Sequence, residues 1–391
     1  MLSRMMHICS RHISSLYLGL ALVIPTFTVA EQPFSFETTP GLLPKTAVPL
    51  NYTLRIQPDL EQRTTKGSAR IEFNVTEPMQ EIMLHALELE FDSISLIDNP
   101  EAPIVLSYTV KKETQTVTIP VNLSVGRHTL LFNYRGKIGT SAEGFFVDHY
   151  NTPHGKKTML GTQFEVADAR RTFPCWDEPV FRATYDITLV IPAQMMGVSN
   201  MPVMHEEPVN SRLKAVTFAR SPSMPSYLVA MYAGEFEVVE IVADGVTQRV
   251  ITTEGKRESA RYALEVSQRV LAYHNAYFGT KYPLPKLDHV AVPNAFSGFS
   301  AMENWGCISY IDTVLLFDPA TASQASQEYV FSVIAHEMAH HWFGNLVTMS
   351  WWDNLWLNEG FASWLESKLT DALNPEWKIS LRANKAKESA M

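Results

Sequence analysis

The sequence predicts an α+β protein of more than one domain, in which a β-rich domain is followed by a helix-rich one. Two observations lead to this prediction. From about Glu37 to Glu240 the apolar residues recur with period two, which is typical of short strands, and after Val242 they recur with a helical period. A length of 391 residues, 46 % of them hydrophobic and 19 % charged, is sufficient for two hydrophobic cores.

The first 30 residues have the layout of an export signal. Arg4 and Arg11 precede an apolar run from Ile13 to Ala30, which ends in small residues before Glu31. We therefore predict a signal peptide at 1–30 that is cleaved, which gives a secreted or periplasmic protein. The alternative is that the segment stays and anchors the chain in a membrane. Only if the segment is uncleaved do we expect membrane contact, and then through this segment alone.

Residues 31–240 are predicted to form the β-rich domain, as a β saddle or sandwich. Short alternating runs separated by Pro, Gly and Asn clusters fill this region. Examples are Tyr52-Leu54-Ile56, Ala69-Ile71-Phe73-Val75 and Tyr185-Ile187-Leu189-Ile191. We find no internal repeat, which excludes solenoids and propellers.

Charge and cysteine content exclude two further classes of protein. The formal net charge is −9, and it becomes −11 without the predicted signal, when 30 Lys and Arg oppose 41 Asp and Glu. Nucleic acid is therefore not an expected partner. Without Cys9 of the signal, only Cys175 and Cys307 remain, too few for a disulfide framework, and we expect two buried free thiols.

Residues 241–391 are predicted to form the second domain. An amphipathic helix ends at Gly279, and a short strand, Leu287 to Val292, follows it. The helical spacing is carried by Val266, Val270, Tyr273 and Tyr277. After a loop rich in Gly, Ser and Phe, the pattern is helical nearly to the end of the chain.

The segment 333–344 predicts half of a metal site. It has a helical period and ends at Gly344, and His336 and His340 lie four residues apart within it. Residues at this spacing share one helix face, so the two imidazoles can bind one ion. Glu337 then lies beside the ion, where a general base for a zinc-bound water belongs.

A hydrolytic zinc usually has three protein ligands, so a third must come from elsewhere. Glu359, separated from His340 by eighteen intervening residues, supplies it from a following helix, and we predict one Zn²⁺ per chain. Glu366 lies seven residues further on the same helix face, where it is either an acceptor for a ligand imidazole or a solvated glutamate. His341 points about 100° away from His340, which favours a surface or packing role.

Three further segments resemble motifs of a known family. Ser300-Ala301-Met302-Glu303-Asn304 resembles the Gly-x-Met-Glu-Asn exopeptidase motif of aminopeptidase N type gluzincins, which include puromycin-sensitive aminopeptidase and leukotriene A4 hydrolase. Thr162-Gln163-Phe164-Glu165 and the run Asp-Ala-Arg-Arg-Thr-Phe-Pro-Cys-Trp-Asp-Glu-Pro at 168–179 resemble the N-terminal domain of the same family. The likeness extends over nearly the whole chain after the signal.

The resemblance implies a thermolysin-like catalytic domain and a substrate with a free amino end. Glu165 and Glu303 would hold the α-ammonium of a peptide, and Gln163 would line the pocket for its first side chain. Two carboxylates that converge on one ammonium form charge-assisted hydrogen bonds, and a blocked N-terminus would leave them unpaired. The residues assigned to substrate binding are Gln163, Glu165, Ala301, Met302, Glu303 and Asn304.

The sequence departs from the family pattern in two ways. Ser300 stands where the motif has its first glycine, and only 32 residues follow Glu359, none of them the tyrosine that the family uses as an oxyanion donor. We therefore expect an incomplete catalytic domain. The favoured function is a zinc aminopeptidase that releases N-terminal residues from peptides. The rival is a zinc-binding, non-catalytic module that holds peptide N-termini.

Overall fold

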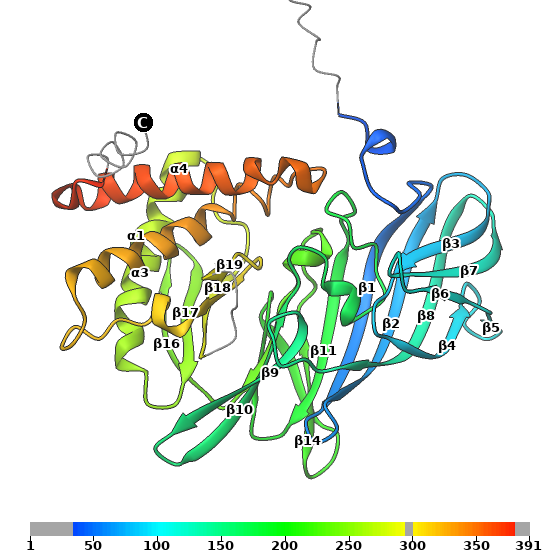
Figure 1. Cartoon of the computed structure of the whole chain (residues 1–391), viewed down its shortest axis with the longest axis horizontal. Helices are drawn as coiled ribbons and strands as arrows, with labels where there is room; N and C mark the ends of the chain where they lie inside the picture. The colour runs from blue at the N-terminus through cyan, green and yellow to red at the C-terminus, as the bar shows by residue number, and fades with distance from the viewer. Residues whose placement is uncertain (1–33, 294–299, 380–391) are drawn as a thin grey trace, which may run out of the picture. The chain divides into compact units, whose positions relative to one another are not determined.

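Two long strands, β1 (Ala47–Asp59) and β2 (Thr64–Val75), begin the β-rich part. Buried side chains alternate along both, because every second residue of a strand faces the core. They lie in an eight-stranded sheet with the order β13-β14-β11-β1-β2-β8-β4-β5 (Figure 1). Its other strands are β4 (Glu90–Leu96), β5 (Ile104–Val105), β8 (Gly126–Lys137), β11 (Thr184–Pro192), β13 (Val203–Pro208) and β14 (Leu213–Phe218).

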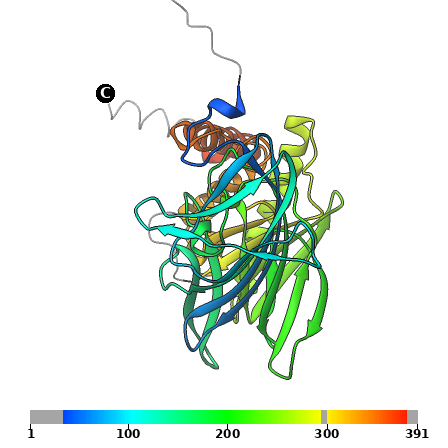
Figure 2. The ribbon, with the colours of Figure 1, turned by 90° about the vertical axis from the view of Figure 1, so that its right-hand side faces the viewer.

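Two smaller sheets complete the β-rich part. One has the order β3-β7-β6 and the other β12-β15-β10-β9. Their strands are β3 (Met79–His85), β6 (Thr109–Lys111), β7 (Thr116–Leu123), β9 (Gly144–Thr152), β10 (Gly155–Gln163), β12 (Met196–Ser199) and β15 (Met231–Gly234). Figure 2 shows the long strands side on. The predicted sheet-rich N-terminal domain is confirmed, and we call strands β1 to β15 the N-terminal sheets.

A five-stranded sheet with the order β16-β17-β18-β20-β19 follows in the chain. Asp244 and Gly245 join its first two strands with φ of 53° and 80°, which is the backbone of a type I′ hairpin turn. The sequence placed the boundary between the two domains between residues 240 and 241, which lies inside the first of these strands. The position of that boundary stays a prediction. The strands are β16 (Phe236–Ala243), β17 (Val246–Thr253), β18 (Lys286–Val292), β19 (Ala301–Met302) and β20 (Cys307–Ile311).

Of three longer helices, two contact this sheet and each other, and the third packs on one of those two (Figure 1). Helix α1 (Arg261–Phe278) stops at Gly279, whose φ of 63° is left-handed, as the sequence predicted. Helix α3 (Gln324–Ala339) follows the short α2 (Asp312–Leu315), and α4 (Trp356–Leu373) packs on α3. Short 3₁₀ turns are η1 (Phe36–Thr38), η2 (Ala169–Arg171), η3 (Ser226–Leu228), η4 (Glu258–Ala260), η5 (Trp352–Asn354) and η6 (Pro375–Trp377).

The helix that carries the metal motif ends earlier than predicted. It stops at Ala339 rather than near Gly344, because the chain turns tightly after His340. In this turn the main-chain N–H of Asn345 donates to the main-chain carbonyl of His340 at 3.0 Å. Gly344 lies within this turn with φ of 121°. Arg182, two residues before β11, contacts the same turn, since its Nη2 donates to the Asn345 main-chain carbonyl at 3.0 Å.

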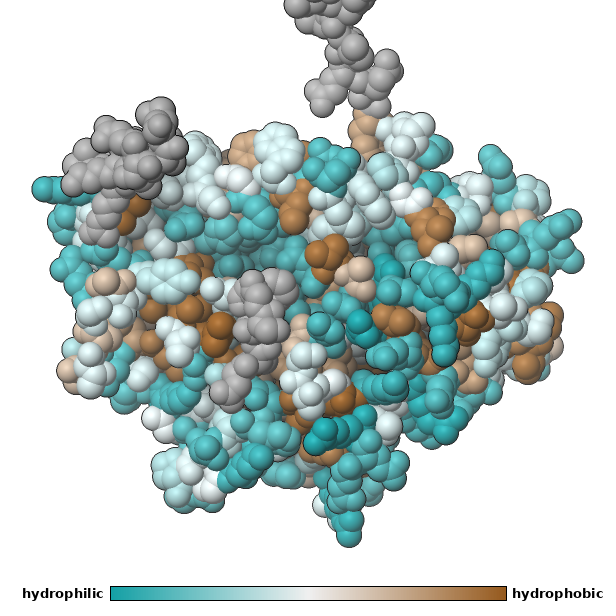
Figure 3. Space-filling model, in the orientation of Figure 1, coloured by the Kyte–Doolittle hydropathy of each residue, from teal (hydrophilic) through white to brown (hydrophobic). Residues whose placement is uncertain are grey.

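The computed structural model describes residues 34–293 and 300–379, so the predicted signal at 1–30 lies outside the described residues. The chain from Phe36 onwards forms one compact unit. Cys175 and Cys307 are buried and free, as expected. No helix among the described residues is long and apolar enough to cross a membrane. The face drawn in Figure 3 is mostly hydrophilic, with apolar residues in small groups.

Candidate metal centre and peptide-binding site

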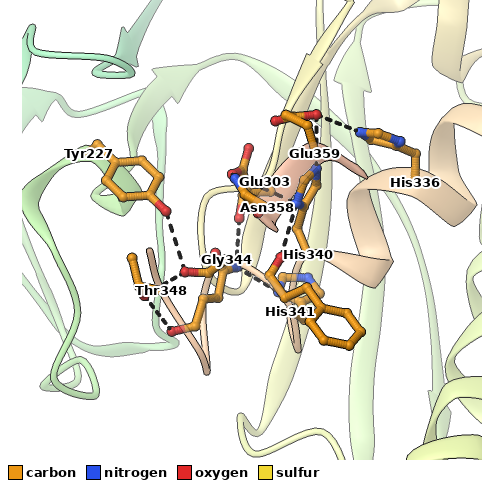
Figure 4. A network of polar contacts seen from close by, with 11 residues as sticks. Tyr227, Glu303, His336, His340, His341, Gly344, Thr348, Asn358 and Glu359 are labelled. Carbon is orange, nitrogen blue, oxygen red and sulfur yellow. Dashed lines mark hydrogen bonds and ion pairs between the residues drawn. The ribbon is translucent and has the colours of Figure 1, made fainter. Parts of the chain in front are cut away.

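The three predicted metal ligands converge. His336 lies in the last turn of α3, His340 caps that helix, and Glu359 lies in the first turn of α4. Glu359 Oε2 is 3.2 Å from His336 Nε2 and 3.8 Å from His340 Nε2 (Figure 4). One nitrogen or oxygen from each residue lies within 4.8 Å of the others, which is compact enough for one ion.

The second nitrogen of each imidazole is also engaged. His336 Nδ1 lies 3.3 Å from Glu366 Oε2, and His340 Nδ1 lies 2.6 Å from Asn358 Oδ1. Both partners can accept a hydrogen bond from Nδ1–H, which leaves the Nε2 lone pairs for a metal. This donor set of two imidazoles and one carboxylate fits Zn²⁺ with an open position. Of the two alternatives for Glu366, the geometry favours the acceptor for a ligand imidazole.

The local field favours a cation at this point. Burial lowers the pKa of His336, but its hydrogen bonds to Glu359 and Glu366 outweigh burial and raise that pKa to about 11. A proton and a metal ion compete for the same nitrogen, so the carboxylates that hold the proton would also favour the metal.

Glu337 lies on α3 beside the ligands, as the sequence predicted. Glu337 is only 6 % exposed, and its Oε2 has no hydrogen-bond partner among the described residues. Burial raises the pKa of its carboxyl well above the usual range, with Glu303 and Glu359 adding to the effect of burial and His336 opposing it. A carboxylate with a raised pKa is a stronger base, which is the property a proton acceptor needs.

Two more carboxylates enter the same pocket from different parts of the chain. Glu165 follows β10 of the N-terminal sheets, and Glu303 follows β19 of the five-stranded sheet. Oxygen atoms of Glu165, Glu303 and Glu359 lie within 4.8 Å of one another. Burial raises the pKa of Glu165 well above its usual value, and the charges of Glu303, Glu359 and Glu337 raise it further. A cationic ligand group placed among them would relieve this repulsion.

The pocket that joins these groups has a volume of about 560 Å³. Ala301 and Glu303 line it, whereas Met302 and Asn304 are buried and do not. Gln163 is also buried and absent from the lining, and both polar atoms of its amide lack a partner among the described residues. The lining residues are Glu165, Val166, Ser300, Ala301, Glu303, Tyr329, Ser332, Val333, His336, Glu337, His340, Leu355, Glu359 and Glu366.

Sequence reasoning missed several residues of the site. Tyr329 and Val333 line the pocket, and their spacing of seven and three residues before His336 places them on the same helix face, which the sequence could have indicated. Asn358 contacts His340, one of the predicted metal ligands. Its only signal in the sequence is that it is a polar residue next to Glu359 in an apolar run. His341 is buried against Tyr282 at 5.1 Å between ring centroids, which is a packing role.

Two histidines of a His-Glu-x-x-His motif on one helix, together with a glutamate from the next helix, form the ligand set of a class of zinc metallopeptidases. Among protein families, the Peptidase M1 N-terminal domain model matches residues 48–228, and the Peptidase family M1 domain model matches residues 262–391. The chain belongs to peptidase family M1. Aminopeptidases of this family are in general zinc enzymes.

Similar proteins are aminopeptidases from bacteria, plants and animals. Aminopeptidase N of Acetobacter pasteurianus is 44 % identical over 354 residues, which cover 90 % of this chain and 98 % of that protein. Aminopeptidase M1 of Arabidopsis thaliana is 42 % identical over 345 residues, 86 % of this chain and 39 % of its own length. Puromycin-sensitive aminopeptidase of Caenorhabditis elegans is 41 % identical over 345 residues, 87 % of this chain and 36 % of its own.

Proposed function

We propose that this protein is a zinc aminopeptidase that releases N-terminal residues from peptides with a free amino end. One observation carries the proposal: the three ligand atoms of His336, His340 and Glu359 share a pocket with Glu165 and Glu303. The first group fits a hydrolytic zinc, and the second fits a primary ammonium. The chain spans well under half the length of its plant and animal relatives, so their activity is carried over as part of this proposal.

The residues of the pocket have separate tasks in the proposed reaction. Bound zinc would supply Lewis acidity, which polarises a carbonyl and lowers the pKa of water. Glu165 and Glu303 hold the α-ammonium, which fixes the first peptide bond relative to the metal ligands. Glu337 accepts the proton of the attacking water and passes it to the leaving amine.

Hydrolysis of a fluorogenic amino-acid amide and of its N-acetylated form tests the proposal. We expect the full chain to cleave the free-amine substrate, to lose this activity with a zinc chelator, and to regain it with added zinc. Glu337→Gln should keep zinc and lose turnover, because it removes the base and no ligand. Equal cleavage of the acetylated amide would refute amine recognition, and zinc-dependent binding without turnover would favour the non-catalytic peptide-binding module.

We also propose that the protein is exported. Arg4, Arg11 and the apolar run that ends at Ala30 support a cleaved signal, which makes the working location extracellular or periplasmic. Sequencing the exported product from its amino end should find Glu31 first. A product that begins at Met1 and sediments with membranes would instead support the anchored alternative.

A further inference from the structure

Asn358 connects the two halves of the site. It lies in the first turn of α4 and is 1 % exposed. Its Nδ2 donates to Glu303 Oε1 at 2.9 Å, and its Oδ1 lies 2.6 Å from His340 Nδ1 (Figure 4). A single amide therefore touches both a carboxylate of the proposed amine site and a proposed zinc ligand.

The chemistry of the partners fixes which way this amide points. A carboxylate can only accept, so the Nδ2 of Asn358 must face Glu303. Its Oδ1 then faces His340 and can only accept, which requires the proton of that imidazole to be on Nδ1. Reversing the amide would place two acceptors against each other at Glu303 and leave a buried carboxylate unsatisfied.

The surrounding turn is shaped to hold this amide. A Cβ at Gly344 would lie 2.2 Å from Asn358 Oδ1, so the chain approaches the amide as closely as only glycine permits. The neighbouring Asn345 donates from Nδ2 to the Glu303 main-chain carbonyl at 2.9 Å. Glu303 is thus held at its backbone by one buried asparagine and at its carboxylate by another.

We propose that Asn358 is a positioning residue that couples zinc binding to recognition of the peptide amino end. With the Phe343 main-chain carbonyl, 3.1 Å from the same Nδ1, it keeps His340 in the tautomer that presents Nε2 to the metal, and its contact is the shorter of the two. It also orients the Glu303 carboxylate toward the ammonium. This inference rests on the proposed function and adds to it that the two recognition events depend on one side chain.

Two readouts separate the halves of this coupling. The first is the zinc dissociation constant, measured by competition with a chromogenic chelator. The second is the ratio between the inhibition constants of an amino-acid hydroxamate and its N-acetylated form, which reports amine recognition. We expect Asn358→Ala to weaken zinc binding about 10- to 100-fold and to lower the free-amine preference about 10-fold, as loss of a hydrogen bond to a charged group predicts.

Asn358→Asp should change amine recognition but not zinc binding. The aspartate still accepts from His340 Nδ1 but cannot donate to Glu303, so zinc affinity should stay within a few fold while the free-amine preference falls. Glu366→Ala, which removes the acceptor of His336 Nδ1, should give the opposite pattern, with weaker zinc binding and an unchanged preference. Asn374→Ala is the matched control, because Asn374 is a buried asparagine at the other end of α4 whose Oδ1 accepts from Arg269. It should leave both readouts unchanged.

The outcomes distinguish this inference from the proposed function. A wild-type chain that binds no zinc or shows no free-amine preference overturns both. If the wild-type chain has both properties and Asn358→Ala leaves either one intact, only the coupling is refuted. Loss of both properties in Asn374→Ala as well would show that Asn358 acts through general stability, which also refutes the coupling.

Discussion

Replacing Gly344 by alanine tests the geometry of the turn that follows the metal helix. With φ of 121°, the position lies outside the backbone regions that L-residues favour, which costs about 1–3 kcal/mol. The added Cβ would meet Asn358 Oδ1 at 2.2 Å, so the amide must move. Losing its hydrogen bond to the charged Glu303 costs about 1.5–3 kcal/mol more. We expect the free energy of unfolding to fall by about 2.5–6 kcal/mol in total.

Gly360→Ala is the internal control for this prediction. Gly360 lies inside α4, and a Cβ there would meet nothing within 4 Å. The same substitution should therefore stabilise the chain by about 0.5–1 kcal/mol, the helix propensity difference between glycine and alanine. Urea unfolding of both metal-free variants measures the two effects. Similar midpoints for Gly344→Ala and the wild type, or equal losses in the two variants, would refute the reasoning.

Three further predictions follow from single contacts. Glu366→Ala should weaken zinc binding about 10-fold or more, because His336 loses the acceptor of its Nδ1–H, and chelator competition measures this. Asp177→Ala should lower the free energy of unfolding by about 3–5 kcal/mol, since it leaves the largely buried Arg170 without its ion-pair partner at 2.8 Å; an unchanged urea midpoint would contradict this. Burial lowers the pKa of His274 to about 3, so between pH 6.5 and 3 only the unfolded chain binds that proton, and stability falls by about 1.4 kcal/mol per pH unit. His274→Phe should lose less stability than the wild type between pH 6.5 and 5, and equal losses would contradict the assignment.

The sequence predicted the parts of the fold and site that depend on local spacing. Period two gave the strands around Tyr52 and Ala69, and the four-residue spacing of His336 and His340 gave the metal helix. The parts of the site that the sequence could not predict depend on contacts between residues far apart in the chain. Asn358 carries no periodic signal, because its partners lie 18 and 55 residues away.

The exopeptidase motif shows a second limit. The resemblance assigned Ala301 through Asn304 to substrate binding as a block, but side chains alternate between the two faces of an extended segment. Ala301 and Glu303 accordingly line the pocket, whereas Met302 and Asn304 are buried away from it. A motif match identifies the segment, and the backbone geometry decides which of its residues can touch a ligand.

The division of the two amine-site carboxylates between the N-terminal sheets and the five-stranded sheet has a mechanical consequence. The three proposed metal ligands lie in α3, at its C-cap and in α4, so they would move together if the two parts rotated about a hinge. Glu165 and Glu303 would not, because each follows a strand of a different part. Such a rotation would separate the carboxylates of Glu165 and Glu303 without changing the arrangement of the metal ligands. Weaker contacts between the two parts would thus impair the proposed recognition of the peptide amino end before they disturbed the proposed metal site.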